Sequence, residues 1–381
     1  MQEHHRVLLC AGTRPELIKL APVYRDLCTR PSFRPYLCLT GQHDSLVRDL
    51  PRALNIAPDF ILERNPGDGS QLGLIKGLSA QLAKILQQLA PRLVVVQGDT
   101  ASSLCAAMTA AHWNIPIAHV EAGLRTHDLL SPFPEELYRQ LISRLAKWHF
   151  CPTRNNRTNL LKENIPRSQI HITGNTSIDA LLEVSRQQKE PLETKSARRP
   201  YILITLHRRE VQGERLAAIA TAFAKFARAH DDFDFRIALH PSPAVRNLLH
   251  HILQPAGNIQ LLPPMDYPDF VPLMKNAFAI LSDSGGIQEE APALDVPVIV
   301  IREKTERQEG VQSGCLRLAG HDPEKIFSEL SMLIRDRDHY IDMCNAKAPF
   351  GDGRAGRQIG AILENLIKEQ TTGYEQSHLP S

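Results

Sequence analysis

No stretch of this chain approaches the roughly 20 consecutive apolar residues that a membrane-crossing helix needs. The apolar run near the N-terminus is also too short for a secretory signal peptide. Cysteine is scarce, with 7 in 381 residues, and no two cysteines stand in a C-x-x-C spacing. These absences argue against a membrane protein and against a disulfide-stapled secreted fold. We therefore expect a cytoplasmic protein whose cysteines are reduced and buried.

An excess of charge of one sign is also missing. The chain has 44 Lys and Arg residues and 42 Asp and Glu residues, which gives a formal net charge of +2. Such a balance lacks the broad basic field that nucleic acid or an anionic membrane surface attracts, so neither is expected as a partner. An anionic ligand must then be held by a few local groups. The 16 histidines have no companion ligands at metal-site spacing, and no metal is predicted.

Short apolar runs alternate with amphipathic stretches along nearly the whole chain. Runs such as Leu93–Val96 and Ala279–Leu281 lead directly into glycine-bearing turns. Strands that are apolar on both faces, with helices between them, predict parallel sheets in an α/β fold. The length favours two Rossmann-like, doubly wound domains. Because such sheets bind ligands beyond the carboxyl ends of their strands, we expect the active site between the domains.

The sharpest change in composition marks the expected domain boundary. Residues 183–200 are polar, charged and interrupted by prolines, which is typical of a linker. They separate an N-terminal domain, residues 1–182, from a C-terminal domain, residues 201–349. A last helical pattern at about 354–368 follows a glycine-rich break and is expected to pack back on the first domain. Residues 371–381 are expected to form a disordered tail.

The segment DSGGIQEE is the most informative in physical terms. A strand ends at Leu281, and Ser284, Gly285 and Gly286 form a tight turn that opens a helix. Glycines let backbone N–H groups approach a phosphate, and the helix N-terminus adds partial positive charge. Glu290, one turn further, is placed to accept hydrogen bonds from both hydroxyls of a ribose. The pattern favours a nucleotide diphosphate, although a simple strand-to-helix turn with solvated acids also fits.

A similar turn stands near the N-terminus in CAGTRPELIK. A strand ends at Cys10, and Pro15 suits the first helical position, where its missing N–H costs nothing. Arg14 at the mouth of the turn and Lys19 one turn on would reach a diphosphate from the other side of the cleft. A capping turn with solvated cations is at least as good an interpretation of this segment alone.

Acidic residues gather in the first half of the chain. Asp99 follows a strand in QGDT, Glu121 closes a strand in HVEAGLR, and Glu135 opens a helix in SPFPEE. Single acids at such places are more often caps, but three within about forty residues, interleaved with Arg139, favour acid–base catalysis. His207 ends the first strand of the second domain and would assist a departing diphosphate. A structural role is the plainer interpretation of a lone histidine there.

Together these motifs resemble a known family. GTRPE, GDT, HVEAGLRT, SPFPEE, HRRE, DSGGIQEEAP and TERQEG follow in order from about residue 11 to about residue 320. The set resembles the non-hydrolysing UDP-N-acetylglucosamine 2-epimerases of bacteria. The resemblance implies a GT-B architecture, with UDP-sugar in a cleft between two Rossmann-like domains, and a homodimer. It also implies that UDP-GlcNAc and UDP-ManNAc interconvert without a redox cofactor, by anti elimination of UDP to a bound 2-acetamidoglucal and re-addition. The product would supply ManNAc-type sugars for bacterial cell-surface polysaccharide.

The resemblance assigns roles to particular residues. The catalytic group would be Asp99, Glu121, Glu135, Arg139 and His207. The substrate-binding group would be Arg14, Lys19, Met265, Phe270, Ser284, Gly285, Gly286, Glu290 and Arg307. Within it, Met265 and Phe270 would contact uracil through their backbone, and Arg307 would close over the nucleotide. Gln42, His43 and His240 would belong to an allosteric site that binds a second UDP-GlcNAc as activator.

Several positions depart from the family's usual pattern. Gln97 replaces a histidine before GDT, His127 replaces a glycine, and Gln308 replaces a proline. The acids and the nucleotide turn are intact, so we expect the chemistry to be kept. One alternative is a paralogue that acts on a modified UDP-HexNAc or releases ManNAc by hydrolysis. An alternative of another class is a GT-B glycosyltransferase, which would have no use for the clustered acids.

Overall fold

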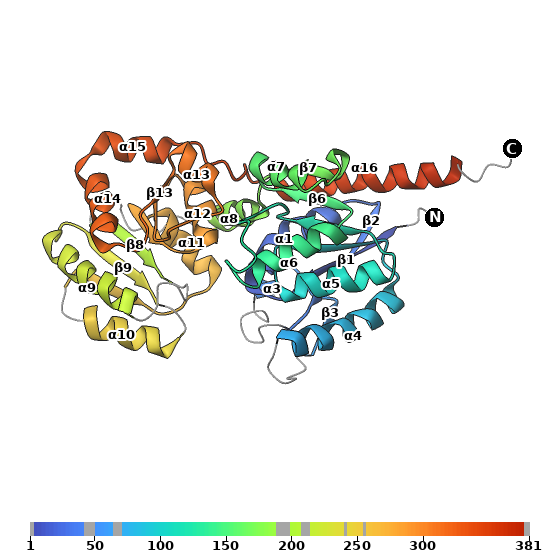
Figure 1. Cartoon of the computed structure of the whole chain (residues 1–381), viewed down its shortest axis with the longest axis horizontal. Coiled ribbons are helices and arrows are strands. Elements are labelled where there is room, and N and C mark those ends of the chain that lie inside the picture. The colour runs from blue at the N-terminus through green and yellow to red at the C-terminus, as the bar shows by residue number, and fades with distance from the viewer. Residues whose placement is uncertain are drawn as a thin grey trace. The chain divides into compact units, whose positions relative to one another are not determined.

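The computed structural model describes residues 4–41, 50–63, 71–187, 199–206, 214–239, 242–253 and 257–376 (Figure 1). The chain divides into two compact α/β units. Unit 1 runs to Ala180 and takes up the chain again from Gly351, whereas unit 2 comprises Leu181–Phe350. Unit 1 is therefore discontinuous in sequence, and unit 2 is a single segment.

The described part of unit 1 contains a seven-stranded parallel sheet in the order β3-β2-β1-β4-β5-β6-β7. Its strands are β1 (His5–Ala11), β2 (Phe33–Leu39), β3 (Phe60–Ile61), β4 (Leu93–Gln97), β5 (Ile117–Val120), β6 (Trp148–Cys151) and β7 (Ile170–Ile172). Every residue of β4 is buried, as expected for a strand covered by helices on both faces. The strand order reverses direction between β1 and β4. A doubly wound sheet binds its ligand at such a switch point, beyond the carboxyl ends of the strands.

Two helices of unit 1, α1 and α5, begin at capped turns next to this switch point. The helices of the unit are α1 (Arg14–Cys28), α3 (Leu50–Ala53), α4 (Gln71–Leu89), α5 (Ala101–His112), α6 (Glu135–Leu145), α7 (Arg154–Lys162), the 3-10 turn η1 (Arg167–Gln169) and α16 (Ala355–Gln376). α8 (Thr176–Gln187) begins in unit 1 and ends in unit 2. Thr13 caps α1, and Thr100 caps α5 by accepting the N–H of Ser103. The two caps fix the turns that follow β1 and β4. Among the described residues, no helix is both long enough and apolar enough to cross a membrane.

The described part of unit 2 contains a six-stranded parallel sheet in the order β10-β9-β8-β11-β12-β13. Its strands are β8 (Tyr201–Thr205), β9 (Asp234–Ala238), β10 (Ile259–Leu262), β11 (Ala279–Ser282), β12 (Val298–Val300) and β13 (Leu316–Leu318). Its helices are α9 (Glu214–Ala229), α10 (Pro243–Leu253), α11 (Tyr267–Lys275), α12 (Gly285–Glu290), the 3-10 turn η3 (Ala291–Leu294), α13 (Gln308–Ser313), α14 (Pro323–Arg335) and α15 (Arg337–Asn345). The switch point lies between β8 and β11, next to Ser284. Both units are Rossmann-like, which confirms the predicted α/β fold.

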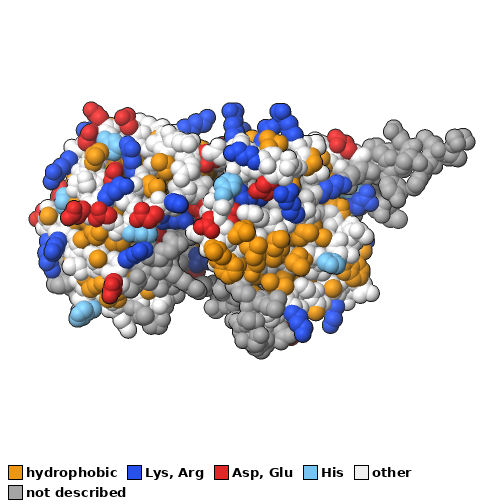
Figure 2. Space-filling model, in the orientation of Figure 1, with side chains coloured by type: hydrophobic (Ala, Val, Ile, Leu, Met, Phe, Trp, Pro, Cys, Tyr) orange, Lys and Arg blue, Asp and Glu red, His pale blue; other side chains and the backbone are white. Residues whose placement is uncertain are grey.

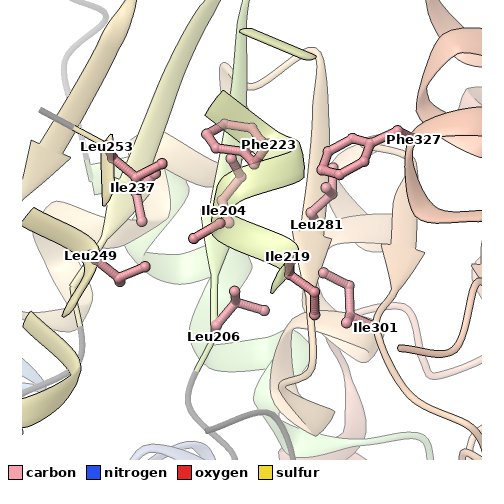
Figure 3. Close-up of a pocket in the computed structure, with 11 residues that line it drawn as sticks. Ile204, Leu206, Ile219, Phe223, Ile237, Leu249, Leu253, Leu281, Ile301 and Phe327 are labelled. Atoms are coloured by element: carbon pink, nitrogen blue, oxygen red, sulfur yellow. The ribbon is translucent and has the colours of Figure 1, made fainter. Parts of the chain in front are cut away.

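The core of unit 2 holds a small gap between α9, α10 and the sheet. Phe223 and Phe235 meet edge to face there, with ring centroids 5.2 Å apart. Beside them lies a cavity of about 20 Å³, and Figure 3 shows Ile204, Leu249 and Leu281 in its wall. All of its lining residues are apolar, and its volume is that of about one water molecule. The gap is therefore a packing feature and not a substrate site.

The last helix, α16, packs closely on α1 within unit 1. A Cβ atom at Gly356 would lie 2.8 Å from the carbonyl carbon of Pro22, so only glycine fits at this crossing. Arg30 Nη1 binds Glu364 Oε2 at 2.8 Å across the same contact. Small residues and an ion pair thus join the first and last helices of the unit.

Two predicted boundaries differ from the structure. α8 continues to Gln187, so the first five residues of the expected 183–200 linker are helical. α16 continues to Gln376, so the expected disordered tail is wrong for residues 371–376. Both helices run on because no proline stands in the way before Pro191 and Pro380. Residues 188–198 and 377–381 lie outside the described residues.

Two buried histidines stand side by side in the sheet of unit 1. His119 of β5 pairs in register with His149 of β6, and neither has exposed surface. Burial lowers the pKa of His119 to about 4. Burial, with a further contribution from His119, lowers the pKa of His149 to about 3. Both rings are therefore neutral in the folded protein near neutral pH.

Acid should destabilise unit 1 through these two histidines. The unfolded chain binds a proton at each near pH 6.5 while the folded protein does not, so the free energy of unfolding falls as the pH drops below 6.5. At pH 5.5 each histidine should account for about 1.4 kcal/mol of that fall. In His149→Leu, the difference in unfolding free energy between pH 8 and pH 5.5 should shrink by this amount, measured by urea denaturation. His112→Leu, at an exposed site, is the control, and an undiminished difference in His149→Leu would contradict the prediction.

Candidate active site

A buried glutamate joins the turns that follow β1 and β4. Glu16 is 1% exposed and accepts the backbone N–H of Gly12 at 3.0 Å. It also accepts the hydroxyls of Thr100 at 2.6 Å and Ser103 at 2.7 Å. Burial raises the pKa of Glu16, and the bonds from Thr100 and Ser103 oppose the shift. Sequence reasoning missed this residue, because its spacing from Thr13 signals only a helix cap while its partners lie more than 80 residues away.

Glu121 directly follows β5 and has a left-handed backbone, with φ of +64°. This conformation is uncommon for a residue with a Cβ atom, costs roughly 1–3 kcal/mol, and clusters at functional sites. Its Oε1 accepts Lys19 Nζ at 2.5 Å and Asn175 Nδ2 at 3.1 Å, and its Oε2 accepts Gln97 Nε2. Donors from α1, from β4 and from the turn before α8 thus fix this carboxylate. Asn175 was not singled out from the sequence, where nothing signals its contact with a residue 54 positions away.

Asp99 forms an ion pair with Arg139 of α6, with Nη2 and Oδ2 2.5 Å apart. The partial burial of Asp99 raises its pKa, the Arg139 guanidinium opposes this, and the negative charges of Glu121 and Glu135 add to the rise. The net effect is a raised pKa for the Asp99 carboxyl. Four residues of the predicted catalytic group, Asp99, Glu121, Glu135 and Arg139, therefore lie in one electrostatically coupled cluster.

The two glutamates that open α6 differ in their surroundings. Glu136 is fully buried and accepts the N–H of Thr126 at 3.0 Å and the amide of Gln140 at 2.9 Å. Arg139 Nη1 lies 3.3 Å from the same carboxylate. Glu135 is only half-buried and lies close enough to Asp99 to raise its pKa. The bonds to Glu136 give it a structural role, which supports the choice of Glu135 as the candidate acid.

His127 stands in the exposed loop before α6 with φ of +62°. A glycine adopts this conformation without strain, which gives a physical reason for the glycine of the family pattern. Histidine is among the side chains that enter this region more often than most. The loop therefore makes a left-handed turn at His127 and exposes its imidazole.

In unit 2, a glycine turn lies against a buried arginine. Ser284 is the N-cap residue of α12, and Gly285 and Gly286 form its first positions. A Cβ atom at Gly285 would lie 2.9 Å from the guanidinium atoms of Arg307, so a larger residue here would displace that guanidinium. The predicted phosphate turn and the arginine predicted to close over the nucleotide are therefore neighbours.

Two carboxylates hold Arg307 in place. Glu289, which is 1% exposed, accepts Arg307 Nε at 2.8 Å, and Glu306 lies 3.4 Å from its Nη1. Burial acts to raise the pKa of Glu306, but the guanidinium groups of Arg307 and Arg302 outweigh it and bring the pKa to about 2. Glu290, the predicted ribose ligand, is 8% exposed at the end of α12. The sequence did not distinguish Glu289 as the partner of Arg307.

The predicted uracil contacts lie at the start of α11. Met265 precedes the helix, Phe270 lies in its first turn, and both are half-buried. The N–H of Phe270 donates to the carbonyl of Asp266 at 2.9 Å. This donor is occupied by the helix itself, so the expected backbone contact with uracil cannot use it.

Four predicted residues, Gln42, His43, His207 and His240, lie outside the described residues. In the part of the chain that the structure describes, no group of three or more His, Cys, Asp or Glu side chains is arranged to hold a metal ion. The described site consists instead of acids, cations and glycine-bearing turns.

Two successive Rossmann-like units, with acids at one switch point and a glycine turn against an arginine at the other, define an enzyme of the GT-B type. A sequence profile described as UDP-N-acetylglucosamine 2-epimerase matches residues 25–364. The UDP-N-acetylglucosamine 2-epimerase of Escherichia coli K12 is 42% identical over 371 residues, which cover 94% of this chain and 98% of the relative. The chain belongs to the UDP-N-acetylglucosamine 2-epimerase family.

Solved structures agree with this assignment. The UDP-GlcNAc 2-epimerase from Neisseria meningitidis bound to UDP-GlcNAc is similar with a TM-score of 0.88 and 37% identity, covering 95% of this chain and 100% of that one. A Staphylococcus aureus MnaA–UDP co-structure is similar with a TM-score of 0.89 and 34% identity, covering 96% and 97%. The family resemblance read from the motifs is confirmed.

Proposed function

We propose that this protein interconverts UDP-GlcNAc and UDP-ManNAc without a redox cofactor. The observation that carries the proposal is the cluster of Asp99, Glu121 and Glu135 with Lys19 and Arg139 at the switch point of unit 1. Relatives named as UDP-GlcNAc 2-epimerases, one of them crystallised with UDP-GlcNAc, support the choice of substrate.

The reaction requires acid–base groups on both faces of the sugar at C2. C2 is only weakly acidic, so removal of its proton is coupled to departure of UDP. A carboxylate takes the proton, the C–H electron pair forms a C1=C2 double bond, and the C1–O bond breaks with its electrons leaving on UDP. The 2-acetamidoglucal stays bound, UDP adds back at C1, and a proton returns to C2 on the other face. No oxidant or reductant is consumed.

Two carboxylates have surroundings that suit opposite steps. Glu121 accepts hydrogen bonds from one ammonium and two amides. These donors orient the carboxylate and balance its charge, so Glu121 suits the role of proton acceptor. Asp99, with its raised pKa, suits the proton donor, and the two exchange roles in the reverse direction. The contact of Lys19 with Glu121 supports a role in holding this acid rather than the diphosphate.

Unit 2 would hold the nucleotide. The backbone N–H groups of Ser284, Gly285 and Gly286 would bind the diphosphate together with Arg307, and Arg14 of unit 1 would add a second cation. Glu290 would bind the ribose, Met265 and Phe270 would contact uracil, and His207 would assist the departing UDP.

Incubation with UDP-GlcNAc in D₂O, followed by proton NMR, tests the proposal. Deuterium at C2 with a new UDP-ManNAc signal supports it, and the absence of both overturns it. Release of free ManNAc together with UDP would show that this protein is instead the hydrolysing paralogue. Transfer of the sugar only when an acceptor is added would identify a glycosyltransferase.

We further propose that a second copy of the chain docks on an apolar face of unit 1. Figure 2 shows hydrophobic side chains gathered over α5 and α6. The exposed members on and around these helices are Met108, Trp113, Leu129, Leu130, Phe133 and Leu141. Contiguous apolar surface of this kind marks interaction sites, and the family resemblance implies a homodimer.

A charge placed on this face should separate the copies. Leu141 is 43% exposed, so Leu141→Asp should fold normally but should bury a carboxylate in the interface. We expect wild-type dimers and Leu141→Asp monomers by size-exclusion chromatography with light scattering. Ile341→Asp, on the 39% exposed Ile341 of unit 2, is the matched control and should remain dimeric. A wild-type monomer, or a dimeric Leu141→Asp, would contradict the proposal.

Three further points complete the proposal. Two of them, supply of ManNAc-type sugars to cell-surface polysaccharide and activation by a second UDP-GlcNAc, follow from the family resemblance, and the third, a cytoplasmic location, follows from the cysteine usage and the short apolar runs of the sequence.

A further inference from the structure

The side-chain amide of Asn175 is fixed at both of its ends. Asn175 is 2% exposed and stands between β7 and α8. Its Oδ1 accepts the N–H of Ser177 in the first turn of α8 at 3.0 Å, and its Nδ2 donates to Glu121 Oε1 at 3.1 Å. The reverse orientation would set two acceptors against each other at Glu121 and two donors at Ser177. The helix terminus therefore dictates that the amide donor points at the carboxylate.

Residues 351–356, where the chain re-enters unit 1, lie close to the turn that contains Asn175. Gly351 has φ of +138°, and a Cβ atom there would lie 3.2 Å from the backbone nitrogen of Asn175 and 3.4 Å from Gly174 Cα. Asp179 of α8 accepts the N–H groups of Ala355 at 3.1 Å and Gly356 at 2.8 Å. Residues 351–356 thus lie against α8 at two places. One is Asn175, directly before the helix, and the other is Asp179 in its first turn.

We propose that Asn175 is a positioning residue that sets the direction and the proton affinity of Glu121, and that the close approach of Gly351 holds Asn175 in place for this task. The inference rests on the proposed role of Glu121 as a proton acceptor. Lys19 shares Oε1 with Asn175, but a lysine ammonium sits on a flexible stem. The amide of Asn175 has one geometry, because its oxygen is already committed to α8.

Asn175→Asp tests the effect on proton affinity with little change in shape. The new carboxylate keeps an acceptor for the N–H of Ser177 but replaces a donor to Glu121 with a second negative charge. Like charges disfavour ionisation, so the acidic limb of the pH–rate profile for C2 exchange should move up by about one pH unit. The kcat at pH 7 should fall at least tenfold, with the Kd for UDP within threefold of wild type. Asn175→Ala removes the donor to Glu121 and the acceptor for the N–H of Ser177 but adds no charge, so it should move the limb in the same direction by less.

Ser177→Ala is the matched control, because it keeps the N–H that binds Asn175 and changes a side chain of the same turn. It should leave the profile in place. If wild-type protein exchanges C2 and both Asn175 variants, folded by circular dichroism, keep the wild-type profile, the inference is wrong and the proposed function stands. If wild-type protein shows no C2 exchange, the proposed function fails and the inference fails with it.

The proposed role of Gly351 in holding Asn175 in place is tested separately. Gly351→Ala should lower kcat at least tenfold with KM nearly unchanged, because its methyl group would displace the backbone of Asn175. Gly314→Ala is the control, since Gly314 has φ of +89° but a Cβ atom there would meet nothing within 4 Å. Gly314→Ala also places a Cβ atom on a backbone of positive φ, but without a close neighbour, so it should keep kcat. Equal kcat in the two alanine variants would overturn the role given to Gly351.

Discussion

Asp99→Asn is expected to abolish deuterium exchange at C2 while leaving UDP binding nearly intact. Asparagine preserves the shape of the side chain but cannot give or take the proton at C2. General acid–base groups typically contribute 10²- to 10⁴-fold, so we expect a fall in kcat of about 10³-fold. The Kd for UDP should stay within a few-fold of wild type, because Asp99 lies in unit 1 and the proposed diphosphate turn lies in unit 2. Exchange is followed by proton NMR in D₂O, and UDP binding by calorimetry.

Loss of an ion pair must be separated from loss of an acid in this experiment. Asp26 offers the matched control, because it pairs with Arg30 at 2.6 Å just as Asp99 pairs with Arg139 at 2.5 Å. Asp26→Asn should exchange C2 at the wild-type rate. If Asp99→Asn also exchanges at nearly the wild-type rate, the acid at this position has no part in proton transfer. The reaction would then depend on Glu121 and Glu135.

Arg307→Met is expected to weaken UDP binding by about 100-fold, equivalent to about 2.7 kcal/mol. The guanidinium lies against Gly285, at the turn proposed to hold the diphosphate, and two charge-assisted hydrogen bonds would be lost. The same change should destabilise unit 2 by about 3 kcal/mol. Glu289, with a side chain 1% exposed, would be left as a buried charge without this cation.

A second substitution separates the two effects. In Arg307→Met combined with Glu289→Gln, the buried charge is removed together with its partner, so most of the lost stability should return. The affinity for UDP should stay about 100-fold low, since the cation is still missing. Calorimetry measures the affinity, and urea denaturation measures the stability. Recovery of UDP affinity in the double variant would show that Arg307 acts only by supporting the fold.

Much of the fold follows from local sequence patterns. The apolar run Leu93–Val96 became β4, the turn Ser284–Gly286 opened α12, and Pro15 fell in the first turn of α1. Each of these depends on neighbours within a few residues, where hydrophobic pattern and backbone preference decide the outcome. The ends of α8 and α16 were harder to predict, because polar helix termini carry weak signals and no proline marks where these helices stop.

The contacts within the site could not be derived in this way. Glu16 and Thr100 are 84 residues apart, and Lys19 and Glu121 are 102 residues apart. The sequence offered Lys19 as a phosphate ligand, since a cation one turn into a helix beside a glycine turn has that appearance. Only the fold shows that this lysine forms an ion pair with Glu121. The motifs identified the family, whereas pairing within the cluster depends on how distant turns meet at the sheet edge.

The contact between α1 and α16 has a consequence for the order in which the chain can fold during synthesis. Arg30 and Glu364 are 334 residues apart, and between them lies the whole of unit 2. A ribosome therefore releases every residue of unit 2 before it makes the helix that completes unit 1. Since domains generally fold as units as the chain emerges, unit 2 is the first to have all of its parts. Until then, the face of α1 that receives Gly356 remains uncovered, and nascent unit 1 is the half of the protein that most needs protection from aggregation.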